Sequence, residues 1–368
     1  MTDDFSAVFE PPLAEPPDLD ALVRATMAWH FSPATGSPYW IGRAAAFGFD
    51  PRSDIGCFAD LRLFDDVAID WSGIPADLLI PAGCRSSDHR FGVYESGGAT
   101  GPPKRIVDAT ARRRNVEWQS ALLDEEGFPS GGDRGGWLHV GPTGPHIMAK
   151  NVGNLAAIRG FLSYHIDLDP RWVRRCLAAG RDDVYRLYLD HILDQVSDVL
   201  SSQDIRALSC TPPIIEQMAA RPDLHKQIAG SVRGIIWGGT SVGAETLRLL
   251  EEEIFPEATI MGAYGNTMMG VAPQRPRRPG DCAPCIFRPY HPFTVVEVVD
   301  PDNPHEVVAD GASGRVKVTA LTRELFVPPI LERDQATRHV PVDGYVGVDL
   351  SDVRPRQLGQ TQIMEGVY

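Results

Sequence analysis

The segment GIIWGGTSVGAE, Gly234–Glu245, decides the fold class of this sequence. Its apolar run, Gly234–Trp237, is followed by two glycines. A helix-like segment, Ala244–Ile254, and a second apolar run, Ala258–Met261, come next. Short apolar runs that alternate with helical segments are typical of strand-helix-strand units, in which the strands lie parallel in one sheet. We therefore predict an α/β fold.

Upstream of this segment, helical patterns occur at three places. Leu19–His30 and the residues around Val116–Leu123 have helical patterns. A third helix is expected to bury one apolar face in the core, because its apolar residues recur at helical spacing. The residues of that face are Val184, Leu187, Tyr188, Ile192, Val196, Val199 and Leu200.

Downstream of Pro276, period-two alternation predicts strands at Phe293–Val299 and Arg315–Leu321, with turns at Pro301–Pro304 and Asp310–Gly314. The chain has 368 residues, which leaves room for more than one domain. We predict an α/β core over 1–275, whose first ~18 residues form a loose leader, and a small β-rich subdomain over 276–334. Residues 335–368 are expected to form a polar, turn-rich tail.

Charge and composition exclude several classes of protein. The chain has 49 acidic and 35 basic side chains, a net charge of −14, which opposes binding to nucleic acid. Its densest basic cluster, Arg112–Arg114, is too short for a nucleic-acid footprint. No apolar run reaches the ~20 residues of a membrane span, and Met1–Pro17 lacks the pattern of a signal peptide. With four of six cysteines scattered singly, we expect a cytoplasmic protein that does not bind membranes.

A glycine-rich segment, SGGATGPPK at Ser96–Lys104, has the composition of a phosphate-binding loop. Its three glycines expose backbone N–H groups, and Ser96, Thr100 and Lys104 add two hydroxyls and a cation. The Walker pattern does not fit, because two prolines separate the last glycine from the lysine and no Ser or Thr follows it. The alternative is an ordinary flexible turn after a strand at Phe91–Tyr94.

This loop resembles the S-S-G-T-T-G-x-P-K loop of adenylate-forming enzymes, the superfamily of acyl-CoA synthetases, luciferases and peptide-synthetase adenylation domains. Two more segments follow in the family's order: Gly238–Glu245 is similar to its G-G-A-P-L-G-A-E, and Ala263–Met268 to its G-Y-G-x-T-E. Leu208–Ile215 and Leu331–Asp334 are weaker matches to its TPPIL turn and its R-T-G-D segment. The resemblance covers most of the chain and implies the family's layered αβαβα sheets.

The resemblance also implies ATP and Mg²⁺ as cofactors. The residues expected to hold the nucleotide are Ser96, Gly97, Gly98, Thr100, Gly101 and Lys104 at the phosphates, Gly239, Thr240, Ser241, Tyr264, Gly265 and Asn266 near adenine, Thr267 at the α-phosphate, and Asp334 at the ribose. For Arg333 and Asp334 a plain surface salt bridge is the alternative.

An acid would lie beside the nucleotide in this scheme. His146, at the end of the segment Pro142–His146, is expected to orient the carboxylate, and a structural histidine is the alternative. A planar ring would lie among Trp237, Gly238, Tyr264 and Met268, although for Trp237 a role as a core residue is the favoured interpretation. Lys104, Thr267 and His146 are the predicted catalytic residues.

Two features depart from the family, Met268 and the C-terminus. Met268 stands where the family has a glutamate that helps hold Mg²⁺, and a thioether is a poor ligand for a hard cation. The family's C-terminal lid domain, with its lysine, is expected to be largely absent. Cys282, Cys285 and His291 have ligand types compatible with zinc, but two free thiols are the alternative, and we assign no metal ligands.

Within the superfamily, the chain is most similar to short stand-alone ligases of phenazine antibiotic pathways, and more distantly to phenylacetate-CoA ligases and acyl-protein synthetases. The resemblance implies that an aromatic, phenazine-like acid is activated as its acyl-adenylate, with release of pyrophosphate, for a downstream reductase or acyl acceptor. A non-catalytic protein of this fold that binds nucleotide or aryl acid is the alternative. We expect a homodimer from the general frequency of such assemblies.

Overall fold

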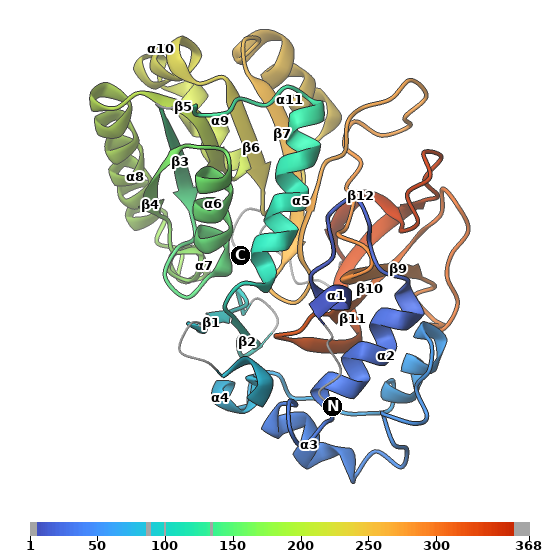
Figure 1. Ribbon diagram of the computed structural model, residues 1–368. Helices are drawn as coiled ribbons and strands as arrows, with labels where there is room; N and C mark the ends of the chain where they lie inside the picture. Colours follow the sequence, from blue (N-terminus) through green and yellow to red (C-terminus); the bar gives the residue numbers. More distant parts are fainter. Residues whose placement is uncertain (1–5, 86–89, 99–100, 133–134, 357–368) are drawn as a thin grey trace. The chain divides into compact units, whose positions relative to one another are not determined.

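The computed structural model describes residues 6–85, 90–98, 101–132 and 135–356 (Figure 1). The chain divides into two compact units. Unit 1 consists of Met1–Asn115, Asn266–Gly270 and Pro289–Leu350, and unit 2 of Val116–Gly265, Val271–Arg288 and Ser351–Tyr368. The domain limits predicted at 275 and 334 follow changes in sequence pattern, whereas these units follow packing between segments that are distant in sequence.

Unit 2 is built on a six-stranded sheet with the order β4-β3-β5-β6-β7-β8. Its strands are β3 (Gly136–Gly141), β4 (Leu162–Asp167), β5 (Ile205–Cys210), β6 (Gly234–Gly238), β7 (Thr259–Asn266) and β8 (Gly270–Pro273). The pairs from β4 to β7 are parallel. After β3 the chain adds β4 on one side and then β5 on the other, so the strand order reverses at β3. The predicted α/β fold is confirmed.

Helices alternate with these strands. They are α5 (Ala111–Glu125, which begins in unit 1), α6 (Ile147–Ile158), α7 (Pro170–Ala178), α8 (Asp182–Ser202), α9 (Pro212–Ala220), α10 (Pro222–Ser231), α11 (Ala244–Leu249) and the π-helical turn η3 (Leu250–Ile254). The core beneath α5 and α6 joins the strand residues Trp137, Ala207 and Ile236 to Leu123 and Leu155 of the helices. Burial of each large apolar side chain in this cluster contributes roughly 1.5–3 kcal/mol.

The expectation for the apolar face of α8 is only partly correct. Ile192 and Val196 are buried as predicted, but Leu187 is 72% exposed and the remaining four residues are half-buried. Leu193, on the neighbouring face, is buried instead. The two buried residues of the predicted face lie in the middle of this 21-residue helix, whereas Leu187 lies nearer its N-terminal end. Periodicity gives the apolar side of a helix but not how much of its length is covered.

Unit 1 combines short N-terminal helices with two antiparallel sheets. Its helices are α1 (Ser6–Phe9), α2 (Leu19–His30), α3 (Pro38–Ala44), α4 (Ala76–Leu79) and the 3-10 segments η1 (Phe58–Phe64) and η2 (Ala82–Cys84). Strands β1 (Gly92–Glu95) and β2 (Arg105–Asp108) form a hairpin. A four-stranded sheet consists of β9 (Thr294–Val299), β10 (Ser313–Leu321), β11 (Phe326–His339) and β12 (Asp349–Pro355, which begins in unit 1).

An aromatic cluster holds these parts of unit 1 together. The ring centroid of Phe326 on β11 lies 5.2 Å from Trp40, 5.3 Å from Phe64 and 6.1 Å from Phe31. Edge-to-face and tilted contacts between aromatic rings stabilise the fold in addition to the contribution from burying their apolar surface. The N-terminal helices therefore share a core with strands that lie some 300 residues later in the chain.

Two expectations for the chain's ends need correction. Residues 6–18 of the predicted loose leader contain α1, and Phe9 is buried against Trp29 with ring centroids 6.2 Å apart. The predicted tail contains the second half of β11 and the strand β12, whose Asp349, Leu350 and Ser351 are buried. Strand β12 contains only two large apolar residues, Leu350 and Val353, so its period-two pattern is weak. No helix in the described parts of the chain is long and apolar enough to span a membrane.

Candidate functional site

The glycine-rich segment forms the loop of the β1–β2 hairpin in unit 1. Glu95 and Arg105 are the last paired residues, and the Arg105 Nε donates to Glu95 Oε1 over 2.9 Å. At the base of the loop, Ser96 N donates to Lys104 O and Lys104 N donates to Ser96 Oγ, each over 2.9 Å. The structure therefore brings Ser96 and Lys104, two of the predicted phosphate contacts, directly together.

Gly98 has a conformation that requires glycine. Its φ is +67°, and a Cβ at this position would lie 3.2 Å from Pro103 Cγ and 3.3 Å from Gly101 O. A side chain would thus add both backbone strain and a close contact. Thr100, predicted to bind phosphate, lies outside the described residues. Gly97 and Gly98 are half-buried, and Gly101 is exposed.

Lys104 is paired with a carboxylate from the other sheet of unit 1. Its Nζ lies 3.3 Å from Glu332 Oε1, and the Lys104 side chain is 37% exposed whereas that of Glu332 is 11% exposed. A cation at the mouth of a glycine-rich loop can neutralise an anion. Here its ammonium group already has a partner, so an incoming anion competes with Glu332.

A β-bulge in β11 contains Glu332 and Asp334. Arg315 of β10 pairs with Gln335 and Lys317 pairs with Leu331, so Val316 alone faces the three residues between them. Such bulges redirect side chains and are frequent beside functional sites. Asp334, the predicted ribose contact, is buried, and its Oδ1 lies 3.6 Å from Arg333 Nε. The ion-pair alternative for Asp334 is thus present, and its ribose role stays a prediction.

Residues 266–270 join unit 1 as a turn between β7 and β8. Asn266 Oδ1 accepts hydrogen bonds from Met268 N and Met269 N, and Thr267 Oγ1 lies 3.5 Å from Glu95 O. Thr267, the predicted α-phosphate contact, therefore lies beside the end of β1, where the hairpin loop begins. In this unit the structure brings together the loop, Thr267 and the strand that carries Asp334.

Arg112 holds this turn, a role the sequence did not indicate. Its NH2 group donates to Thr267 O over 2.8 Å and to Met268 O over 3.0 Å, and burial lowers the pKa of the guanidinium. Asp108, four residues earlier in the chain, accepts a hydrogen bond from Arg112 N and raises that pKa. Nothing in the run of three arginines distinguishes the buried one from its neighbours.

Met268 is 2% exposed. Its side chain packs in the interior, and this thioether has no oxygen that could bind a cation. In the part of the chain that the structure describes, no three His, Cys, Asp or Glu side chains are close enough to hold a metal ion. Cys285 is buried with its Sγ 3.1 Å from Gln274 Oε1, and Cys282 is exposed. Burial raises the pKa of the Cys285 thiol to about 12, which disfavours the thiolate that zinc requires.

The remaining predicted residues lie in unit 2, at the carboxyl ends of its parallel strands. Gly238 ends β6, Gly239 and Thr240 follow it half-buried, and Ser241 is exposed before α11. Tyr264 and Gly265 are among the last residues of β7, which ends at Asn266. Parallel sheets bind ligands at this edge. The roles of these residues at adenine stay predictions.

His146 occupies the N-cap position of α6, in the connection that follows β3. Its backbone N–H donates to Thr143 O, and the side chain is half-buried and makes no capping bond. Thr143 is fixed in turn by Asp167 of β4, whose Oδ1 accepts from Thr143 N over 2.9 Å. His146 thus lies at the same strand edge as Gly238, and its action on a carboxylate stays a prediction.

Trp237 and Tyr264 both contact Phe287. The ring centroids are 6.1 Å apart in each pair, at interplanar angles of 79° and 53°. Trp237 is buried, as the core alternative expects, whereas Tyr264 is half-buried and keeps part of its ring available to a ligand. Of the two predicted aromatic walls, the geometry favours Tyr264.

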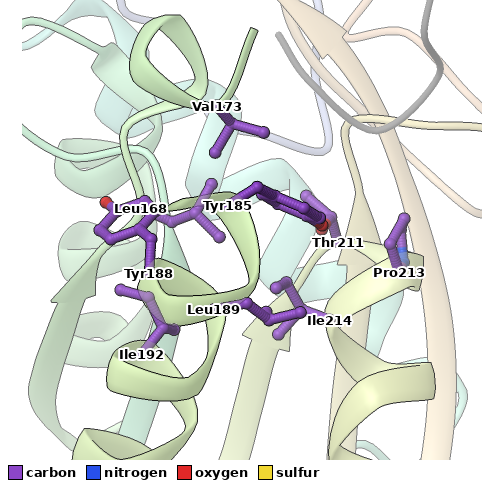
Figure 2. A pocket seen from close by; sticks show the side chains of 9 residues that line it. All are labelled: Leu168, Val173, Tyr185, Tyr188, Leu189, Ile192, Thr211, Pro213 and Ile214. Atoms are coloured by element: carbon purple, nitrogen blue, oxygen red, sulfur yellow. The ribbon is translucent and has the colours of Figure 1, made fainter. Parts of the chain in front are cut away.

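Two hollows within unit 2 are lined by other residues. One is a cavity of about 20 Å³. Figure 2 shows its lining side chains, most of which come from α7, α8 and α9, among them Tyr185, Ile192 and Ile214. This volume holds about one water molecule, far less than an aromatic acid. The other is an open depression of about 480 Å³, lined mainly by residues from the first turns of α8. Neither contains a predicted site residue, and we assign no ligand to them.

Comparison with solved structures identifies the architecture. A 2-hydroxyisobutyryl-CoA ligase in complex with 2-HIB-AMP and CoA matches 95% of this chain and 70% of its own, with a TM-score of 0.61 and 12% identity. The same ligase in its postadenylation state matches with a TM-score of 0.56, over 95% of this chain and 69% of its own, at 12% identity. This chain has the adenylate-forming fold. ATP-bound MatB from Rhodopseudomonas palustris shares 18% identity over 72% of this chain and 47% of its own, with a TM-score of 0.47.

No family model matches the chain. No curated protein matches it either. The adenylate-forming fold is therefore recognised from structure at an identity too low to transfer an activity. The structure adds two residues to the candidate site, Glu332 and Arg112. The motifs did not include them, because both act through contacts between segments that are distant in sequence.

Proposed function

We propose that this protein activates an aromatic carboxylic acid with ATP, forming the acyl-adenylate and releasing pyrophosphate. The observation that carries the proposal is the hairpin loop Ser96–Lys104, which is closed at its base, lined by glycines and beside Thr267. The adenylate-forming fold and the order of the three motifs support it.

The chemistry requires placement and charge compensation. A carboxylate reacts poorly with nucleophiles, because its leaving group would be oxide. When its oxygen attacks the α-phosphorus of ATP, a new P–O bond forms and the bond to pyrophosphate breaks. The mixed anhydride that results has AMP as a good leaving group. Holding the acid and the nucleotide in line supplies most of the acceleration in such a reaction.

The chain's own residues would serve this reaction in three ways. Lys104 would neutralise the charge that develops on the departing pyrophosphate, and the N–H groups of Gly97 and Gly98 would donate to its oxygens. The Thr267 hydroxyl would donate to the α-phosphate. His146 would orient the carboxylate of the acid.

The donor set fits a Mg²⁺ ion that is carried by the nucleotide. Met268 supplies no oxygen, and the described residues contain no three-ligand group. Mg²⁺ commonly keeps several waters and binds through substrate phosphates, where it neutralises their charge. The loop and Lys104 would then hold the phosphates of the complex rather than the ion.

For the acid, we propose a planar, phenazine-like ring against the half-buried face of Tyr264. Aromatic faces favour stacking with planar ligands. The activated acyl group would pass to a partner in a secondary-metabolite pathway, and CoA, a carrier protein and a reductase remain the three classes of acceptor. A cytoplasmic homodimer is part of this proposal.

A second candidate is a non-catalytic protein of the same fold that binds nucleotide or aryl acid. Two observations favour it: the buried Met268 replaces an oxygen ligand, and Lys104 is already paired with Glu332. Both candidates predict nucleotide binding, and only the first predicts turnover.

Acid-dependent exchange between pyrophosphate and ATP separates the two. We expect exchange in the presence of Mg²⁺ with phenazine-1-carboxylate and not with fatty acids. Lys104→Met should lower the exchange rate at least tenfold through loss of a charge-assisted contact, about 1.5–3 kcal/mol. Lys226→Met, which changes an exposed lysine on α10, is the matched control. ATP binding without exchange for any acid would favour the non-catalytic candidate.

A further inference from the structure

The two edges of the six-stranded sheet in unit 2 differ in exposure (Figure 1). At one edge lies β8, whose four residues are all buried and whose last residue, Pro273, has no backbone N–H. At the other edge lies β4, in which only Ile166 is buried. Leu162, its first residue, is 69% exposed. The first edge is therefore covered, whereas the second meets solvent along most of its length.

The hydrogen bonds to β3 decide which backbone groups of β4 are left over. The two strands are parallel. Leu162 N donates to Gly135 O, and six residues later Leu168 N donates to Gly141 O. Because alternate residues of a strand direct their N–H and C=O groups to opposite neighbours, the even-numbered residues of β4 bond to β3. The odd-numbered residues direct theirs away from the sheet, and these are Ser163, His165 and Asp167.

This outer edge is open and unprotected. Its three outward-directed residues are all exposed, and in the described parts of the chain neither Ser163 N nor His165 N bonds to another backbone group. The Tyr188 hydroxyl lies 3.4 Å from Asp167 O and marks the end of the open stretch. Edge strands are commonly protected by proline, lysine or a bulge. Strand β4 has no proline or lysine, and its register with β3 is unbroken.

A second copy of this chain fits the edge in one antiparallel register. Placing His165 opposite His165 of the second copy sets Ser163 opposite Asp167, so every outward-directed residue of β4 gains a partner. Registers centred on Tyr164 or Ile166 leave one of the three unpaired within the strand. A two-fold axis generates this antiparallel arrangement, because it reverses the direction of the second strand.

The charges along β4 are compatible with this contact. The chain has a net charge of −14, so two copies repel unless their contact surface is nearly uncharged. Asp167 carries the one formal charge in β4, and it would face Ser163 rather than another carboxylate. Burial lowers the pKa of His165 from 6.5, so two neutral rings would meet at the axis at pH 7.5. A second copy therefore meets no like charge at this edge.

We propose that β4 is the self-association surface of this protein, at which a second copy adds its own β4 in antiparallel orientation. The two His165 residues exchange backbone N–H to C=O hydrogen bonds across the axis, and Ser163 exchanges them with Asp167 of the second copy. Main-chain bonds supply the affinity in such strand addition. This inference gives the homodimer of the proposed function its interface, and it does not depend on acid activation.

Cysteine substitution at the axis tests the register. In a hydrogen-bonded antiparallel pair the Cα atoms are about 5.5 Å apart, which is within the range of a disulfide. His165→Cys should therefore form a covalent dimer on mild oxidation, visible on a non-reducing gel. Ser163→Cys is the matched control, because its copies would lie about 13 Å apart along the strands. Both variants carry Cys282→Ser, which removes an exposed native thiol.

Sedimentation velocity measures the association without a disulfide. We expect the wild-type protein to form dimers at micromolar concentration. His165→Lys brings two ammonium groups together at the axis and should raise the dissociation constant of the dimer at least tenfold. His191→Lys adds the same charge at an exposed position of α8 and should leave that constant unchanged. Circular dichroism of each variant verifies that it is folded.

The outcomes separate this inference from the proposed reaction. Wild-type protein that is monomeric at every concentration overturns the homodimer and the inference together, whereas pyrophosphate–ATP exchange reports acid activation independently. A dimer that His165→Lys does not weaken overturns the inference alone. Covalent dimers of Ser163→Cys in place of His165→Cys do the same, because they require a different register.

Discussion

Glu332 Oε1 lies 3.3 Å from Lys104 Nζ, although 228 residues separate the two in sequence. The pair connects the glycine-rich loop of one sheet of unit 1 to the bulge in the other. Because the Glu332 side chain is nearly buried and Lys104 is partly exposed, the lysine is the member that can move. An anion at the loop must therefore draw Lys104 away from Glu332 or bind beside a carboxylate.

Glu332→Gln should raise the affinity for inorganic tripolyphosphate. The substitution removes the competitor for Lys104 and a negative charge near the loop. A partly exposed pair is worth up to about 1 kcal/mol, so we expect an increase of roughly three- to fivefold. Isothermal titration without divalent cations measures it. Glu306→Gln removes the same charge from an exposed turn and should change nothing. Weaker binding by Glu332→Gln would instead show that Glu332 positions the lysine.

The two sides of α8 should differ sharply in their effect on stability. Ile192→Ala removes a side chain that is 1% exposed and should lower the free energy of unfolding by about 2–5 kcal/mol. Leu187→Ala, one and a half turns earlier on the same helix, should change it by less than about 0.5 kcal/mol. Urea denaturation followed by circular dichroism gives both values. A large loss for Leu187→Ala would contradict the exposure of this face.

Acid should destabilise the protein through His30. Burial lowers the pKa of this histidine from 6.5 to about 4. Between these pH values the unfolded chain binds a proton that the native state does not, so the free energy of unfolding falls as the pH falls from 6.5 to 4. The full effect is about 3 kcal/mol, and it vanishes above the unfolded pKa.

His30→Leu should flatten this part of the pH profile, whatever it does to stability at pH 7.5. Chemical denaturation between pH 4 and pH 7.5 provides the comparison. His191→Asn, at an exposed position of α8, should keep the wild-type slope. An unchanged slope in His30→Leu would mean that His30 titrates normally in the native state.

Cys282 should be the most reactive thiol of the native protein. It is exposed, whereas burial raises the pKa of Cys285 to about 12 and also raises the pKa of Cys84 and Cys210. Reactivity requires the thiolate and access. Brief treatment with N-ethylmaleimide and peptide mass spectrometry should find label at Cys282 first. Equal labelling of Cys282 and Cys285 would argue against the packing of this segment.

Much of the fold could be predicted where local patterns decide structure. The helix at Leu19–His30 begins and ends as expected, because Asp18 caps it and its apolar residues are regularly spaced. The strand β6 and helix α11 follow the alternation seen around Gly234–Glu245. Glycine and apolar spacing are local properties, and the sequence displays them directly.

The remaining features depend on packing between distant segments. Strand β12 was missed because its residues are mostly polar, and it is buried only through its place beside β11. The same limit applies to the candidate site. Ser96, Lys104 and Thr267 could be predicted from motifs, whereas Glu332 and Arg112 act through contacts across 228 and 155 residues. Neither residue type nor spacing reveals such partners.

The interleaved composition of unit 1 sets an order for its assembly on the ribosome. Its first segment, Met1–Asn115, shares a core with Pro289–Leu350, so the early helices cannot complete their packing until the late strands emerge. At about 5–20 residues per second, that wait lasts on the order of ten seconds or more. During this interval apolar side chains such as Trp40 lack their final partners. Chaperone dependence in the cell would then reflect the path of the chain rather than weak native contacts.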